Sequence, residues 1–119
     1  MVCYNNVDFK PAHPNMENQI PVIDLFAGPG GLGEGFSSFA HQKKSPFKIV
    51  LSVEKDPFAI ETLRLRSFYR QFRYSGNAVC DEYYSYLRGE LRKEELFRKY
   101  KNEAEAASSE VVKMELGKD

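Results

Sequence analysis

The sequence predicts an α/β fold built on a parallel sheet, and three observations support this prediction. A short apolar run at residues 22–26 leads into a glycine-rich turn and then into a helical pattern. A second run, rich in β-branched residues, spans 48–53 and is again followed by a helical pattern. The residues from 74 onward instead carry many charges and few β-branched side chains. We therefore expect the first two βα units of a parallel sheet, followed by a helical C-terminal segment.

The composition divides the 119 residues into three parts. Residues 1–20 are polar and contain two prolines, which predicts a flexible leader without regular structure. Residues 21–73 hold the two strand–helix units, and residues 74–119 form a charged helical insertion that we expect to be incomplete. No apolar run approaches the roughly 20 residues that span a bilayer, so we expect no membrane partner and a cytoplasmic location.

The first strand–helix unit combines a buried strand with a short amphipathic helix. Its strand residues form an apolar run that a glycine ends, as expected for a strand covered on both faces of a parallel sheet. The helix is expected from about Gly31 to Ala40. The apolar side chains predicted on one face of this helix are Leu32, Phe36 and Phe39.

The second unit has a clear helix start. Its strand, Lys48 to Val53, closes on Glu54. Asp56 can cap the free N–H groups of a helix, and Pro57 suits the first helical position, so we expect a helix from there to about residue 72. Four arginines are expected on the solvated face of this helix: Arg64, Arg66, Arg70 and Arg73.

The C-terminal part is expected to be helical at Asp81–Leu87 and again at Lys93–Lys113, with Gly89 between the two helices. Two strands alone make too small a parallel sheet, because such sheets usually have about four to six strands and both faces covered. We therefore expect the domain to be completed by a missing C-terminal segment or by a complementing chain.

The glycine-rich turn has the spacing of a nucleotide-binding loop. Gly28, Gly30 and Gly33 satisfy Gly-x-Gly-x-x-Gly, and Glu54 lies about as far downstream as the acid that binds a ribose. Spacing alone therefore allows a Rossmann-type oxidoreductase fragment that binds NAD or FAD.

Two acidic residues beside the turn favour a different ligand. Asp24 stands at the end of the first strand and Glu34 in the first turn of the helix. Two like charges about 5 Å apart repel by roughly 3 kcal/mol at an effective dielectric near 20, which disfavours a pyrophosphate. Carboxylates suit positive groups, such as the ammonium and sulfonium of S-adenosylmethionine.

The stretch Asp-Leu-Phe-Ala-Gly-Pro-Gly-Gly-Leu at 24–32, followed by Val-Glu-Lys-Asp-Pro at 53–57, resembles the N-terminal region of DNA cytosine-5 methyltransferases. The resemblance covers about residues 21–72. It implies the first part of a Rossmann-like class I methyltransferase fold, S-adenosylmethionine as cofactor and DNA as the partner of the complete enzyme. The reaction that it implies is methyl transfer to C5 of cytosine.

The resemblance also implies roles for particular residues. Phe26 would pack against the cofactor, the backbone as far as Leu32 would wrap its methionine end, and Glu54 would bind the ribose hydroxyls. The family usually has a bulky apolar residue after this glutamate, whereas this chain has Lys55, whose aliphatic stem could lie over the adenine. The implied cofactor-binding residues are Asp24, Phe26, Ala27, Gly28, Gly30, Gly31, Leu32, Glu54 and Lys55.

No catalytic residue is assigned in this chain. In the family, a cysteine in a Pro-Cys-Gln loop attacks C6 of a flipped cytosine, and neither Cys3 nor Cys80 has those neighbours. The two cysteines also lack the Cys/His spacing of a metal site. We expect the chain alone to be inactive, and a non-catalytic module that binds S-adenosylmethionine remains an alternative.

Overall fold

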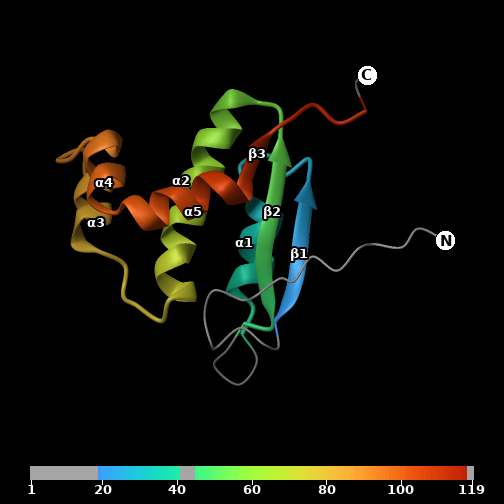
Figure 1. The fold of residues 1–119 in the computed structure, drawn as a ribbon, viewed down its shortest axis with the longest axis horizontal. Helices are drawn as coiled ribbons and strands as arrows, with labels where there is room; N and C mark the ends of the chain where they lie inside the picture. Colours follow the sequence, from blue (N-terminus) through green and yellow to red (C-terminus); the bar gives the residue numbers. More distant parts are fainter. Residues whose placement is uncertain (1–18, 41–44, 118–119) are drawn as a thin grey trace.

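The computed structural model describes residues 19–40 and 45–117. Within these residues a three-stranded parallel sheet has the order β1-β2-β3 (Figure 1). The strands are β1 (Ile20–Leu25), β2 (Phe47–Glu54) and β3 (Val111–Lys113). The helices are α1 (Gly31–Ser38), α2 (Pro57–Tyr74), α3 (Asp81–Leu87), α4 (Lys93–Lys99) and α5 (Lys101–Glu110).

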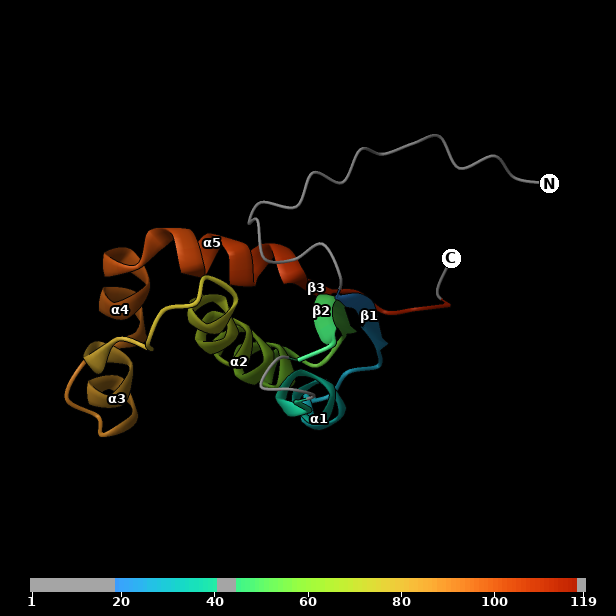
Figure 2. The same ribbon diagram turned by 90° about the horizontal axis from the view of Figure 1, so that it is seen from below.

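Helix α2 packs against both the sheet and the C-terminal helix α5. It begins as the sequence predicts, because the Asp56 side chain accepts a 2.8 Å hydrogen bond from the Ala59 N–H and Pro57 occupies the first turn. Helices α1 and α2 lie on one side of the strands, and α5 runs beside α2 (Figure 2). Helices α3 and α4 lie at the end of the molecule away from β1 (Figure 1).

Two apolar clusters stabilise this arrangement, and α2 contributes to both. The smaller cluster joins Ile60 and Leu63 of α2 to Val111 of β3, with Ala27 packed against it. The larger cluster joins α2 to α4 and α5 and consists of Phe68, Phe72, Leu96, Ala104 and Ala107. Partly buried side chains around it include Cys80, which supports a structural role for that thiol; Cys3 lies outside the described residues.

The sequence prediction is confirmed for α3 at its predicted bounds and is wrong for the helix predicted over Lys93–Lys113. That segment bends at Tyr100, forms α4 and α5, and then becomes β3. Val111 pairs with Ser52 of β2 and is 2% exposed, so sheet pairing and burial of a β-branched residue override the helical pattern before it. The sheet therefore has a third strand where the sequence predicted only helix.

The sheet remains open at β1. This strand pairs with β2, and no second neighbour is found for it among the described residues. Three of its apolar side chains are more than half exposed: Ile20, Ile23 and Leu25. Ile20 belongs to β1 although the leader was predicted to include it, and residues 1–18 of that leader lie outside the described part. No helix in the described ranges is long and apolar enough to cross a membrane.

Candidate functional site

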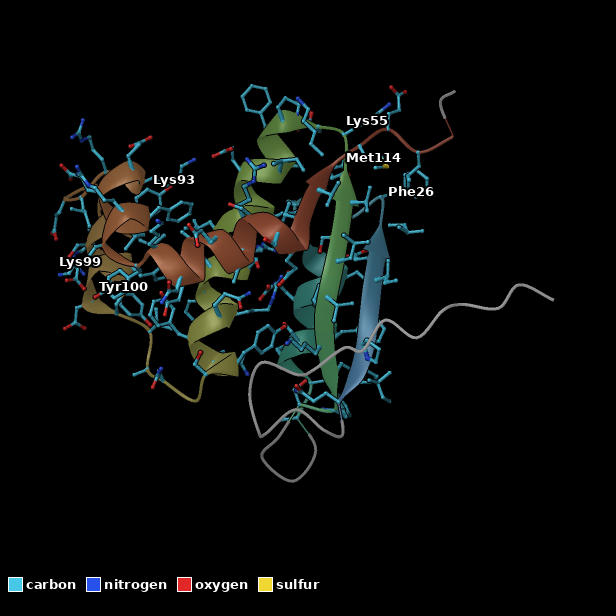
Figure 3. All side chains as sticks on the ribbon, viewed as in Figure 1. Phe26, Lys55, Lys93, Lys99, Tyr100 and Met114 are labelled. Carbon is cyan, nitrogen blue, oxygen red and sulfur yellow. The ribbon has the colours of Figure 1, made fainter. Side chains whose placement is uncertain are left out.

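The three strands end at the same edge of the sheet, and the residues that follow them meet there. We call this region the carboxyl edge and define it as residues 26–32, 54–55 and 114–115. Figure 3 shows Phe26, Lys55 and Met114 together at this end of the strands. Backbone bonds to β2 hold the edge: the Ala27 N–H donates to the Val53 carbonyl at 3.0 Å, and the Met114 N–H donates to the Glu54 carbonyl at 2.9 Å.

The turn after β1 has an unusual backbone. Phe26 has φ 57°, a left-handed conformation that costs a side-chain-bearing residue about 1–3 kcal/mol, and its side chain is 74% exposed. Gly28 and Gly30 also have positive φ, and the Gly30 N–H closes the turn by donating to the Ala27 carbonyl at 3.1 Å. A strained backbone thus presents a large aromatic ring to solvent at the start of the glycine turn.

The glycines at positions 30, 31 and 33 differ in whether the fold requires them. A Cβ on Gly30 would lie 2.8 Å from Leu63 Cδ2, and one on Gly33 would lie 3.3 Å from Asp24 Oδ2, so close packing explains both positions. A Cβ on Gly31 would meet nothing within 4 Å, and its φ is not positive. Packing and φ therefore leave Gly31 unexplained, at the point where α1 offers its first free N–H groups.

The Glu54 carboxylate connects the turn after β1 to the end of β2. Its Oε2 accepts the Gly28 N–H at 2.7 Å, and its Oε1 accepts the N–H groups of Lys55 and Asp56 at 2.8 and 3.0 Å. These hydrogen bonds, with the bond from Asp56 the largest contributor, lower the pKa of Glu54. A carboxylate has about four acceptor positions, so the three bonds leave one for a ligand.

The two acids predicted beside the turn are in different surroundings. Asp24 is 7% exposed beneath α1, and its Oδ2 has no hydrogen-bond partner. Glu34 instead pairs with the guanidinium of Arg70. Arg70 offsets part of the charge of Glu34, because its guanidinium is shared with Glu110, so Asp24 is the more important acid for the electrostatic argument.

The prediction that Arg70 lies on the solvated face of its helix is wrong. Arg70 is 2% exposed and also bonds Glu110, the last residue of α5, at 2.5 Å. Leu32 is 67% exposed and Lys55 is exposed as well, so both predicted site residues lie at the accessible surface of the edge.

Sequence reasoning missed the contribution of β3 to the edge. Met114 follows this strand and is 52% exposed, and the Glu115 carboxylate lies 3.7 Å from the Lys55 ammonium. The pair Val111-Val112 is the signal that could have indicated a strand, but it follows ten helical residues that are rich in Ala, Glu and Ser. Within the described residues no group of His, Cys, Asp or Glu side chains is arranged to hold a metal.

Comparisons with known proteins identify the family of the chain. Residues 20–81, just over half of the chain, match the family model described as C-5 cytosine-specific DNA methylase. Over 67 residues the chain is 43% identical to the Type II methyltransferase M.Bpa9945I of Bacillus paralicheniformis (strain ATCC 9945a / NCIMB 11709 / CD-2). That match covers 56% of this chain and 13% of the Bacillus protein. No solved structure matches the chain.

Proposed function

Because the chain belongs to the family of C-5 cytosine-specific DNA methylases, we propose that it forms the S-adenosylmethionine-binding part of a DNA cytosine-5 methyltransferase. The complete enzyme transfers the methyl group to C5 of cytosine in DNA. The other 87% of the Bacillus relative has no counterpart in this match, so the activity of a whole enzyme is part of the proposal.

The observation that carries the proposal is the exposed Phe26 ring at the start of a glycine turn that the Glu54 carboxylate binds through the Gly28 N–H. Exposure of a phenylalanine forgoes about 1.5–3 kcal/mol of burial free energy, and the positive φ of Phe26 adds a further cost. Nothing in the described part of the chain covers 74% of this side chain. A ligand that packs on the ring offsets both costs, which favours a binding role for the turn.

The residues of the carboxyl edge fit the parts of S-adenosylmethionine, whose sulfonium supplies the methyl group. The face of the Phe26 ring attracts a cation such as the sulfonium. The free N–H groups at the start of α1, near Gly31 and Leu32, suit the methionine carboxylate. The remaining acceptor position of Glu54 suits one ribose hydroxyl.

The other proposed contacts surround these three. Ala27, Gly28 and Gly30 belong to the turn whose backbone would wrap the cofactor, and we propose that the stem of Lys55 lies over the adenine. Asp24 is buried, so we propose that it acts on the ammonium of the cofactor through its charge and not by a direct contact. A second ribose hydroxyl could bind Glu54 only if the Gly28 N–H released Oε2.

The remaining steps are assigned to residues outside this chain. The cysteine nucleophile and the DNA contacts come from a segment that follows or from a complementing chain, and such a segment would also cover the open edge of β1. The chain alone is then inactive. The similarity to a Type II methyltransferase suggests a role in restriction-modification, and we expect the enzyme to work in the cytoplasm.

Calorimetric titration of the protein with S-adenosylhomocysteine and with NADH tests the proposal. We expect saturable binding of S-adenosylhomocysteine and none of NADH, with weaker binding in Phe26→Ala. Binding of NADH alone would support the oxidoreductase alternative. Methylation of DNA by the full-length gene product, followed with labelled S-adenosylmethionine, separates an enzyme from a non-catalytic binding module.

A further inference from the structure

Four charged side chains lie behind the carboxyl edge and join four elements of the fold. Arg70 of α2 is at the centre, and Glu34 of α1, Glu110 of α5 and Lys48 of β2 surround it. We call this group the Arg70 cluster. Arg70 is 2% exposed and Glu110 is 6% exposed, so the central ion pair is almost fully removed from water.

The guanidinium of Arg70 divides its donors between two carboxylates. Its Nη1 donates to Glu34 and its Nη2 donates to Glu110 Oε1 at 2.5 Å, while Gln71 Nε2 donates to Glu110 Oε2 at 3.3 Å. Burial alone lowers the pKa of Arg70, but Glu110 and Glu34 outweigh it and raise that pKa, so the guanidinium stays charged. Burial also lowers the pKa of Lys48, and the Glu110 carboxylate opposes this shift.

The energetics of such a cluster favour a geometric role. Taking charges out of water costs several kcal/mol per ion, and well-packed apolar residues often replace a buried ion pair without loss of stability. Arginine differs from lysine in its planar fork of donors, which fixes the directions from which two carboxylates can approach. The cluster therefore specifies where α1 and α5 lie against α2 more than it stabilises the fold.

The two carboxylates belong to the segments that adjoin the two outer parts of the carboxyl edge in the chain. Glu34 lies in the first turn of α1, directly after the glycine turn. Glu110 is the last residue of α5 and is followed immediately by Val111, the first residue of β3. Because no loop separates α5 from β3, the position of Glu110 determines where Met114 and Glu115 reach the edge.

We propose that the Arg70 cluster sets the position of β3 relative to the glycine turn, and that Arg70 is therefore a positioning residue for the cofactor. Arg70 acts through Glu34 and Glu110 and does not touch the ligand. This inference rests on the proposed function of the carboxyl edge. It predicts that a change at the cluster alters ligand affinity even when the protein remains folded.

Titrations of three variants with S-adenosylhomocysteine test the inference. Arg70→Lys keeps the charge but cannot bridge both carboxylates, and Glu110→Gln keeps the shape but removes the charge that Arg70 binds. The matched control is Arg73→Lys, because Arg73 is exposed on the same helix. At a temperature well below the unfolding midpoint of each variant, we expect about tenfold weaker binding in the first two and unchanged binding in the control.

Amide hydrogen exchange of the same proteins without ligand provides a readout that does not depend on the proposed function. We expect Glu110→Gln to accelerate exchange in α1 as well as in β3, although Glu110 belongs to neither element. Acceleration confined to β3, with wild-type affinity for S-adenosylhomocysteine, would overturn the inference and leave the cluster a local structural feature. If the wild-type protein binds no S-adenosylhomocysteine, the proposed function fails while the exchange measurement still decides whether the cluster couples α1 to β3.

Discussion

The carboxyl edge and the helical module of the same chain differ in how far their large side chains are buried. We define the helical module as α3, α4 and α5 with the part of α2 that carries Phe68 and Phe72. In this module Phe68 is fully buried and its ring contacts four other aromatic rings, those of Phe72, Tyr83, Phe97 and Tyr100. At the edge, Phe26 and Met114 are more than half exposed, and just before it in the chain Asp24 Oδ2 has no hydrogen-bond partner among the described residues.

This difference separates stability from binding. The helical module buries its aromatic side chains against one another, so a substitution of one of these rings should change the free energy of unfolding and leave the ligand site intact. The edge leaves an aromatic ring, helix N–H groups and a carboxylate position without internal partners, so substitutions there should act mainly on binding. Figure 3 shows how far apart the two regions lie, with Tyr100 in one and Phe26 in the other.

The largest expected effect is on stability, from Phe68→Ala in the helical module. Removal of a fully buried phenylalanine side chain should lower the free energy of unfolding by about 3–5 kcal/mol, because a cavity replaces its contacts. Urea denaturation followed by circular dichroism measures this loss. A loss below about 1 kcal/mol would contradict the assignment of Phe68 to a packed core.

The next largest effect is on binding, from Glu54→Ala at the edge. Loss of charge-assisted hydrogen bonds should weaken binding of S-adenosylhomocysteine by about 2–4 kcal/mol in the complete protein. Calorimetry measures the change, and Glu90→Ala serves as the control because Glu90 is an exposed acid paired with Arg88 between α3 and α4. Unchanged affinity in Glu54→Ala would remove Glu54 from the site.

Two adjacent glycines sharpen the comparison within the edge itself. Gly30→Ala should destabilise the fold by about 1–3 kcal/mol, because its φ of 93° is strained for alanine and Leu63 lies too close. Gly31→Ala should leave stability equal or raise it by up to about 1 kcal/mol, since alanine is the better helix former. We expect Gly31→Ala nevertheless to weaken ligand binding, and thermal unfolding together with calorimetry would separate the two effects.

The smallest effect is the pH dependence of the turn. The pKa of Glu54 is lower in the folded chain than in the unfolded chain, so its stabilising contribution is present above the unfolded value and is lost as the pH falls through the folded value. Amide proton shifts of Gly28, Lys55 and Asp56 should move together in this acidic range. A Glu54→Gln variant should lack the transition, and a transition that persists in that variant would have to come from another group.

The sequence predicts those parts of the molecule that local patterns determine. The Asp56-Pro57 start of α2 and the bounds of α3 are set by neighbouring residues, and the position of Glu54 at the end of β2 follows from the β-branched run before it. The strand β3 could not be predicted in the same way. It has three residues, and its partner Ser52 lies 59 positions earlier in the chain, so only tertiary pairing distinguishes it from the end of a helix.

The role of Arg70 was also beyond local patterns. Its spacing on α2 resembles that of Arg66 and Arg73, and only the arrival of Glu110 from the end of α5 explains why Arg70 is buried. The same holds for the ion pair of Glu34, whose partner Arg70 lies 36 residues away in the chain. In both cases a long-range ion pair determines the surroundings of the side chain.

Nuclear magnetic resonance titration of the ¹⁵N-labelled protein with S-adenosylhomocysteine tests the central claim most directly. We predict that saturating ligand shifts the amide signals of residues 26–32, 54–55 and 114–115, while the signals of α3 and α4 stay in place. Shifts confined to the helical module, or an edge that responds to NADH and not to S-adenosylhomocysteine, would contradict the account.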